Sequence, residues 1–323
     1  MTSREFGGYL PLELDQKFEE HYKSDTEWNV VNLNSGRATF YFAASVGRFK
    51  RVFVPHFTCA NTEDPFRNLG LEVQKYFLDS SLLPSKIHAK SDDLILWTNY
   101  FGNARGEEIS EVCSRYSNLI IDNCHAFFTP PRAGAFNCYS TRKFFGVPDG
   151  GYLVSQETVS TKDTKRDISV DKFSHLIEQI DCGTNEGYLE YLKNEAKLDT
   201  KYLLMSTLTR SILKTIDYEE IKKTRLRNFL AMHDSLGDSN EFDINLHSET
   251  HMYYPFKSRT MNLRENLLKS KIYTPFWWRH VLKEVPNTSI EFDLAVNTVH
   301  LPIDQRYNLS DIAAICRIVK GYL

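Results

Sequence analysis

Short apolar runs alternate with helical stretches over the first half of the chain. The apolar runs are rich in Val, Ile, Leu and Phe, which favours strands at 51–54, 71–73, 94–97 and 119–121. The segments 38–46 and 107–116 have apolar residues at helical spacing and lie before or between these runs. Repeated strand, helix, strand predicts an α/β fold with a mostly parallel central sheet and helices on both faces.

The second half of the chain changes character after a last predicted strand at 152–154. Residues 156–185 are polar with weak periodicity, which indicates a surface excursion. Helical patterns then run with breaks from 188 to 237, and strand and helix patterns alternate again over 252–319. This organisation predicts three parts: a large α/β domain with an N-terminal arm (1–190), linking helices (191–240) and a small C-terminal α+β domain (241–323).

Composition and charge point to a small-molecule partner. The chain has 323 residues, 41% of them hydrophobic, so it can bury a large core. A formal net charge of −3 without long single-sign blocks gives no footprint for nucleic acid or a membrane surface. No apolar run has the length of a signal peptide or a membrane span, so we expect a cytoplasmic protein. The six cysteines form no CxxC pair, which predicts reduced thiols and no metal site.

Polar residues follow the carboxyl ends of the predicted strands, where open α/β sheets bind ligands. They are His56, Thr58, Thr98, Asn99, Tyr100, Asp122 and Asn123. Ahead of the first predicted helix stands the small polar turn Asn34-Ser35-Gly36-Arg37. A helix N-terminus presents unpaired N–H groups and a positive partial charge, so this turn suits a phosphate.

Two residues in this region have chemistry of their own. Asp122 ends an apolar strand, so either it meets a cation, such as a heterocyclic N–H⁺, a metal or an arginine, or it caps the next helix. Lys143 stands between Tyr139 and two phenylalanines and before the Gly150-Gly151 turn. A lysine amine held neutral in such a setting can form a Schiff base, although a lysine at a strand edge commonly just extends to solvent.

In combination these motifs resemble the DegT/DnrJ/EryC1/StrS family of sugar aminotransferases, which have fold type I of pyridoxal 5'-phosphate (PLP) enzymes. The resemblance extends over nearly the whole chain. The similar segments are Asn34-Ser35-Gly36-Arg37, Val54-Pro55-His56-Phe57-Thr58, Asn99-Tyr100-Phe101-Gly102, the stretch from Asp122 to His125, Lys143 with its glycine-rich turn, and three C-terminal segments at 225–229, 263–268 and 301–303.

The resemblance implies a role for each site residue. Ser35, Gly36 and Arg37 would bind the PLP phosphate, and Asp122 would pair with the pyridine nitrogen. His125 would contact the ring, the alternative being a core histidine bonded to a backbone carbonyl, and Lys143 would form the internal aldimine. Cys138 stands where the family has a phosphate-binding serine, which leaves Ser140 or Asn137 as a substitute, and Cys59 stands where it has Phe or Trp.

The implied function is a PLP-dependent aminotransferase that acts on a keto sugar nucleotide with an amino acid as donor, and the implied assembly is a homodimer. A PLP-dependent sugar dehydratase or eliminase is the alternative reaction. Cys59 and Cys138 keep a third possibility open, a non-catalytic binding protein with the same fold. The aromatic cluster 273–278 fits either core packing or contact with a substrate's apolar or sugar face.

Overall fold

The structure is a computed structural model that describes residues 9–197, 201–248 and 251–323. Within these ranges, an eight-stranded sheet has the order β1-β8-β7-β6-β5-β2-β3-β4. The strands are β1 (Asn29–Leu33), β2 (Arg51–Pro55), β3 (Glu72–Leu78), β4 (Pro84–Ser85), β5 (Asp93–Thr98), β6 (Leu119–Asp122), β7 (Phe136–Ser140) and β8 (Gly151–Ser155). Strands β7, β6, β5, β2 and β3 are parallel, whereas β1, β8 and β4 run antiparallel to their neighbours. The predicted mostly parallel sheet is confirmed.

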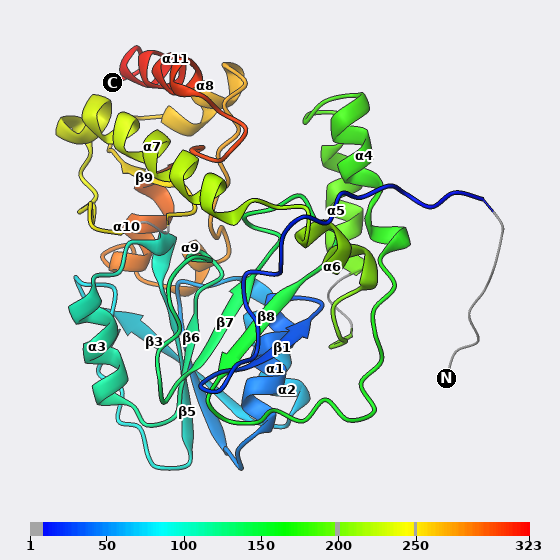
Figure 1. Ribbon diagram of the computed structural model, residues 1–323. Helices are drawn as coiled ribbons and strands as arrows, with labels where there is room; N and C mark the ends of the chain where they lie inside the picture. Colours follow the sequence, from blue (N-terminus) through cyan, green and yellow to red (C-terminus); the bar gives the residue numbers. More distant parts are fainter. Residues whose placement is uncertain (1–8, 198–200, 249–250) are drawn as a thin grey trace.

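Both faces of this sheet are buried, as β5 illustrates. Leu94 and Leu96 point into one apolar cluster, and Ile95 and Trp97 point into another. The first cluster is covered by α1 and α2, and the second by α3 (Figure 1). These helices are α1 (Gly36–Ser45), α2 (Asp64–Asn68) and α3 (Gly106–Arg115). The central four residues of β5 are all apolar because the strand is buried on both sides, which is why its sequence does not alternate.

Strand β7 is not among the predicted strands, because the polar Asn137 interrupts its apolar pattern. Asn137 is nevertheless fully buried. Its side-chain amide donates hydrogen bonds to the carbonyl oxygens of Ala135 and Val154, at 3.0 and 3.2 Å. A polar side chain is tolerated at this core position because backbone acceptors satisfy it.

The predicted polar excursion is only partly irregular. A helix, α4 (Ser174–Asp181), lies inside it, so this part of the excursion is ordered rather than a loop. The helix is hard to recognise from sequence because its apolar residues face outward, with Ile177 48% and Ile180 84% exposed. Helix α5 (Tyr188–Lys197) packs beside α4, and Figure 1 shows the two projecting from one side of the molecule.

The C-terminal part has a second, two-stranded sheet, in which β9 and β10 pair antiparallel. Long helix α7 and helices α8 and α11 pack around it, with Phe229, Phe256 and Leu301 in their common core. Helices α9 and α10 instead pack on the large sheet through Val281 and Leu294. The elements are α6 (Thr207–Leu213), α7 (Tyr218–Leu236), β9 (Tyr254–Lys257), α8 (Leu263–Lys269), α9 (Val281–Glu284), α10 (Ile290–Asn297), β10 (Thr298–Leu301) and α11 (Leu309–Lys320). The domain boundaries at 190 and 240 stay predictions.

The described part of the predicted N-terminal arm, residues 9–28, contains no helix or strand. Tyr22 anchors it, since this side chain is only 9% exposed and its ring stacks on Tyr139 with centroids 4.3 Å apart. The Tyr22 hydroxyl donates to the carbonyl oxygen of Phe127 at 2.5 Å. The arm is therefore tied to the sheet near the strand that precedes Lys143.

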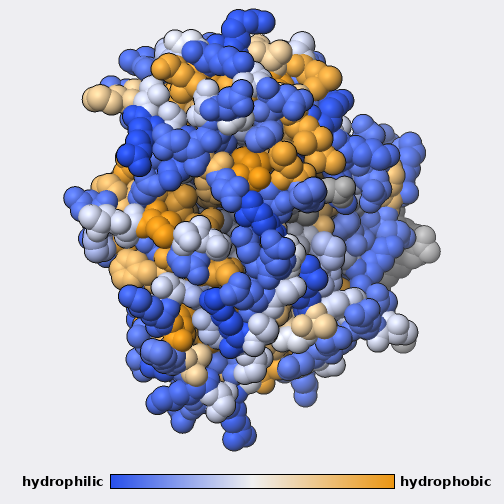
Figure 2. Space-filling model, turned by 90° about the vertical axis from the view of Figure 1, so that its left-hand side faces the viewer, coloured by the Kyte–Doolittle hydropathy of each residue, from blue (hydrophilic) through white to orange (hydrophobic). Residues whose placement is uncertain are grey.

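The surface is mainly polar where it can be seen. Figure 2 shows hydrophilic side chains over most of one face, with hydrophobic ones in smaller groups between them. Among the helices of the described ranges, none combines the length and the apolar character needed to cross a membrane. In the same ranges, no group of three or more His, Cys, Asp or Glu side chains is arranged to hold a metal ion.

Gly151 offers a test of the packing at the start of β8. An ideal Cβ on this residue would lie 2.7 Å from the Ser35 carbonyl oxygen and 3.0 Å from that of Tyr139. Because backbone atoms cannot move aside cheaply, we expect Gly151→Ala to lower the free energy of unfolding by about 1–3 kcal/mol in urea titrations. Gly106→Ala is the control, since nothing lies within 4 Å of its added carbon. Equal midpoints for the two variants would contradict this packing.

Candidate functional site

The first turn of α1 follows directly from the end of β1 and is capped by a side chain. Ser35 Oγ accepts a hydrogen bond from the Ala38 N–H at 3.1 Å, and the Ser35 carbonyl oxygen accepts one from the Thr39 N–H at 3.2 Å. Gly36 and Arg37 supply the first N–H groups of the helix. The predicted anion-binding turn thus lies at the positive end of a ten-residue helix.

Close packing brings this turn against the ends of two strands. A Cβ on Gly36 would lie 2.9 Å from the Cys124 sulfur and 3.9 Å from the Ser140 Cβ, so only glycine allows this approach. Ser140 is the last residue of β7 and pairs with Gly151 of β8. The structure therefore brings Gly36 together with Ser140, as the predicted phosphate site requires.

Asp122 is the last residue of β6 and is only 8% exposed. Its Oδ1 accepts the Cys124 N–H at 2.9 Å, and its Oδ2 accepts the Thr98 hydroxyl at 3.3 Å. No helix begins here, so the predicted capping role is replaced by a tight turn. Over residues 9–197, 201–248 and 251–323, no ion pair involves Asp122. Because a buried carboxylate is costly without a cation, this one is suited to a positively charged ligand atom.

A buried aspartate, Asp149, fixes the turn that carries Lys143. Asp149 accepts the Ser206 N–H at 2.8 Å and the Ser206 hydroxyl at 2.7 Å, at the N-terminus of α6. The Gly150 N–H donates to the Asn34 carbonyl oxygen at 2.8 Å, which ties the Lys143 turn to the turn before α1. Sequence reasoning found the glycines but missed Asp149.

Lys143 itself is exposed, whereas Phe144 and Phe145 are buried. The expectation that the aromatic residues surround the amine is therefore wrong, because they point into the core and the lysine points away from it. The Lys143 Nζ lies 5.8 Å from the ring centroid of Trp277. A cavity of about 460 Å³ opens beside the lysine.

His125 is 1% exposed, and the ring of Trp277 stacks on it with centroids 4.4 Å apart and an interplanar angle of 19°. Burial, followed by the charge of Lys143, holds the pKa of His125 well below its usual range, so the ring is neutral. Its Nδ1 is buried and has no hydrogen-bond partner among the described residues. A ligand ring that packed on this face of His125 would have to displace Trp277.

Trp277 is the site residue that sequence reasoning identified least well. It belongs to the aromatic cluster 273–278, for which both core packing and ligand contact were predicted. Trp277 also stacks on His300, with centroids 4.3 Å apart, and packs against the core cluster beside the large sheet. The side chain thus packs in a core and lines the site at the same time.

The two unusual cysteines differ in position. Cys138 is fully buried and pairs with Asp122 in the register of β6 and β7, and burial raises the pKa of its thiol. Ser140 lies two residues further along β7, and therefore on the same face of the sheet. Cys59, in contrast, is exposed. Ser140 is thus the hydroxyl that lies closest in sequence to Cys138 on this face.

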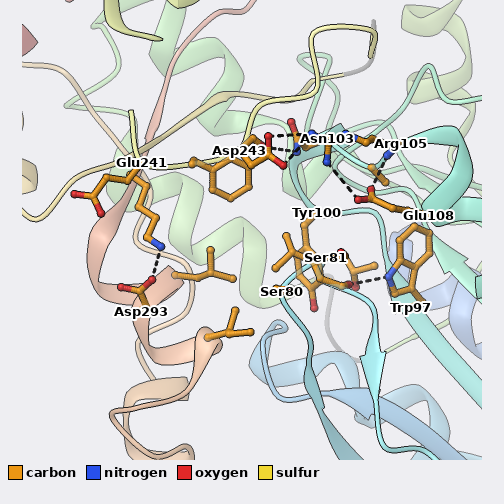
Figure 3. A pocket seen from close by; sticks show the side chains of 17 residues that line it. Ser80, Ser81, Trp97, Tyr100, Asn103, Arg105, Glu108, Glu241, Asp243 and Asp293 are labelled. Carbon is orange, nitrogen blue, oxygen red and sulfur yellow. Dashed lines mark hydrogen bonds and ion pairs between the residues drawn. The ribbon is translucent and has the colours of Figure 1, made fainter. Parts of the chain in front are cut away.

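A different cavity, of about 300 Å³, lies between β5, α3 and the start of the C-terminal part (Figure 3). Its polar side chains are engaged with one another: Arg105 pairs with Asp243 at 2.9 Å, and Lys257 pairs with Asp293. None of the predicted site residues lines it. The cavity of about 460 Å³, in contrast, has Lys143 in its wall.

The fold is that of PLP-dependent fold-type-I aminotransferases, and the similar solved structures include a sugar aminotransferase and a DegT DnrJ EryC1 StrS aminotransferase. A sugar aminotransferase from Micromonospora echinospora has a TM-score of 0.64 and 16% sequence identity, covering 91% of this chain and 87% of its own. A DegT DnrJ EryC1 StrS aminotransferase from Brucella abortus has a TM-score of 0.63 and 15% identity, with coverages of 91% and 86%.

A third similar structure is that of an enzyme described by a different reaction. The E. coli GDP-4-keto-6-deoxy-D-mannose-3-dehydratase with bound hydrated PLP has a TM-score of 0.58 and 17% identity, covering 90% of this chain and 87% of its own. No protein-family model matches the sequence, and no curated protein sequence matches it either. At these identities the likeness defines the fold, and the reaction has to be argued from the site.

The stack between Trp277 and the two histidines leads to a measurable pKa change. Burial lowers the pKa of His300 to about 3 and is also the largest cause at His125. We expect Trp277→Ala to raise both values toward the ordinary value of about 6.5, because solvent reaches the rings. NMR titration of the imidazole resonances from about pH 8 to pH 5 measures this. Trp28→Ala removes a partly buried tryptophan elsewhere, and an equal response to both substitutions would contradict the stack.

Proposed function

We propose that the protein is a PLP-dependent enzyme that transfers an amino group from an amino acid to a keto group of a sugar nucleotide. One observation carries this proposal: Asp122, a buried strand-end carboxylate with no ion pair to any described residue, lies at the same edge of the sheet as the start of α1 and the turn that carries Lys143. Several of the similar solved structures are described as sugar aminotransferases, among them one in PLP form and one in PMP form.

The residues present fit the cofactor. The uncompensated Asp122 carboxylate matches a protonated pyridine nitrogen, and the start of α1 matches a phosphate. Gly36 and Gly151 keep side chains out of the space between α1 and β7. Lys143 is the attachment point, since its amine is exposed at the cavity rather than engaged in an ion pair with another described residue.

When bound, PLP withdraws electrons from the bonds at the substrate carbon next to nitrogen. Asp122 would hold the proton on the pyridine nitrogen, because losing it would leave the carboxylate buried without a counter-charge. Ser35, Gly36, Arg37 and Ser140 would hold the phosphate and thereby fix the ring. The Lys143 Nζ would move the proton at the substrate carbon.

His125 would act as a neutral contact to the ring, since its pKa is lowered well below the usual range by burial and by the charge of Lys143. Its unpaired Nδ1 provides a hydrogen-bonding atom for a cofactor oxygen. Stacking of the cofactor on the covered face of His125 requires Trp277 to move, whereas a contact at the ring edge does not. Edge contact is therefore the arrangement that we propose.

The proposed assembly is a homodimer in the cytoplasm. Apolar side chains exposed on α4 and α5 support it, with Ile180 84% and Leu189 69% exposed. Light scattering at several protein concentrations tests it, because a monomer at all of them would contradict the dimer.

Lys143→Ala tests the attachment point. The wild-type protein with added PLP should show the near-visible absorbance of lysine-bound PLP. The variant should lose this band, and its activity should fall by about 10²–10⁴-fold. Lys50→Ala, an exposed lysine before β2, should retain both. A colourless wild type that takes up no PLP would instead support the non-catalytic binding protein. Product analysis with a keto sugar nucleotide and glutamate separates the reactions, since a dehydrated sugar would assign the dehydratase.

Asp122→Asn tests the strand-end carboxylate. The asparagine oxygen can still accept the Cys124 N–H, so the protein without cofactor should unfold at an unchanged temperature. Its PLP affinity should fall at least about 10-fold, because the pyridine nitrogen loses its charged partner. Thr98→Val removes only the hydroxyl that donates to Asp122 and should weaken PLP binding less. Unchanged PLP affinity together with a lowered unfolding temperature would reduce Asp122 to a structural residue.

A further inference from the structure

The cavity beside Lys143 lies between three parts of the chain that are distant in sequence. Its walls come from the turn at 142–147, from the α4–α5 pair and from α7 with residues 304–306. Figure 1 shows α4 and α5 rising beside the N-terminal end of α7. With a volume of about 460 Å³, the space can hold a small organic molecule.

The charges of this cavity do not balance within the described residues. Arg142 pairs with Glu195 of α5, and Arg306 pairs with Asp304 at 2.7 Å. The carboxylates of Glu195 and Asp304 are therefore already paired with arginines. Lys143 and Arg225 line the same cavity, and in the part of the chain that the structure describes neither forms an ion pair.

Arg225, on α7, is a buried cation held by neutral acceptors. The residue is 4% exposed, and its guanidinium lies over the Phe144 ring at 4.6 Å from the centroid. One terminal nitrogen donates to the Met252 carbonyl oxygen at 2.6 Å and the other to Gln305 Oε1 at 2.9 Å. Its Nε is buried and has no hydrogen-bond partner among the described residues.

Such an arginine is expensive to bury. Burial lowers the pKa of Arg225 to about 10, which still leaves the side chain charged at neutral pH. Removing a guanidinium from water without a counter-ion costs several kcal/mol, and carbonyl acceptors compensate only part of it. The charge of Asp304 offsets part of this lowering of the Arg225 pKa. Asp304 forms no ion pair with Arg225, however, because both of its carboxylate oxygens accept hydrogen bonds from Arg306. A bound oxyanion would supply the missing charge.

The remaining walls suit the organic part of such a ligand. Tyr191 of α5 and Tyr253 before β9 line the cavity with ring surface, and His175 of α4 is held neutral because burial and then Arg142 lower its pKa. Aromatic rings next to an arginine guanidinium, which can donate two parallel hydrogen bonds, are common where a protein binds an organic anion.

We propose that this cavity binds the oxyanion of the substrate, a carboxylate or a phosphate, with Arg225 as its buried partner and Arg306 at the rim. The inference rests on the proposed function, because the cavity counts as a substrate site only if Lys143, which lines it, is the catalytic lysine. It identifies Arg225 as a substrate-positioning residue, and it places the α4–α5 pair as one wall of the substrate site.

Calorimetric titration of the PLP-loaded protein with L-glutamate and, separately, with UDP tests the proposal. One probe should bind to the wild type, and Arg225→Met should weaken it by about 10- to 100-fold, as expected for a hydrogen-bonded charge pair. Arg225→Lys, which keeps the charge, should recover part of the loss. The probe that loses affinity distinguishes a carboxylate from a phosphate as the ligand.

Arg166→Met is the matched control, because this arginine also donates to a backbone carbonyl, that of Met205 at 2.6 Å, but lines another cavity. It should leave the titration unchanged. If Arg225→Met does not fold, Arg225→Lys and Arg306→Gln decide the question, and both should weaken the same probe. Unchanged affinity in the folded variants, or no binding of either probe, overturns the proposal.

The absorbance of each sample separates this result from a failure of the proposed function. A wild type that takes up no PLP but binds UDP or glutamate through Arg225 would refute the enzyme and keep the anion site. If instead the wild type takes up PLP and substitution of Arg225 leaves the binding of both probes unchanged, the anion site is refuted and the proposed enzyme function is kept.

Discussion

A buried carboxylate at the end of a central strand is the constraint around which this molecule is arranged. Asp122 reaches the carboxyl edge of the sheet because β6 is flanked by parallel strands on both sides. Two neutral donors, the Cys124 N–H and the Thr98 hydroxyl, hold it in place without neutralising it. The fold thus holds a buried carboxyl group in a position that suits a cationic ligand atom.

The positive counterpart of this charge comes from backbone geometry. Glycines at 36 and 151 let α1 approach β7 and β8 so closely that an added carbon would overlap neighbouring atoms. The helix start therefore lies beside Ser140, within the same edge as Asp122. Asp149, bonded to the start of α6, fixes the turn that presents Lys143. Opposite charges are held at one edge by packing rather than by contact with each other.

The C-terminal half contributes side chains around His125 and Lys143. Trp277 lies on His125 and near Lys143, and Arg225 lines the cavity into which the lysine opens. These residues come from segments more than 80 positions after Lys143, and the hydrophobic cores that hold them also contain residues of the large sheet or of β9 and β10. Access to the lysine and the chemistry of its surroundings are therefore properties of the whole chain.

Local patterns were sufficient for most elements and for the site residues with a local signature. Apolar runs, a small turn before a helix and a lysine before two glycines define β2, β5, β6, the start of α1 and the Lys143 turn, because short-range sterics and burial decide them. β7 was not predicted, since Asn137 is satisfied by carbonyl groups that only the folded sheet provides.

The sequence by itself thus determined the mostly parallel sheet, its polar edge and the candidates Ser35, Asp122 and Lys143. Only the tertiary structure decided that Lys143 is exposed, that Trp277 covers His125 and that Arg225 is buried without an ion pair to any described residue. The physical reason is that charge compensation and solvent access depend on neighbours distant in sequence, whose arrangement no local pattern records.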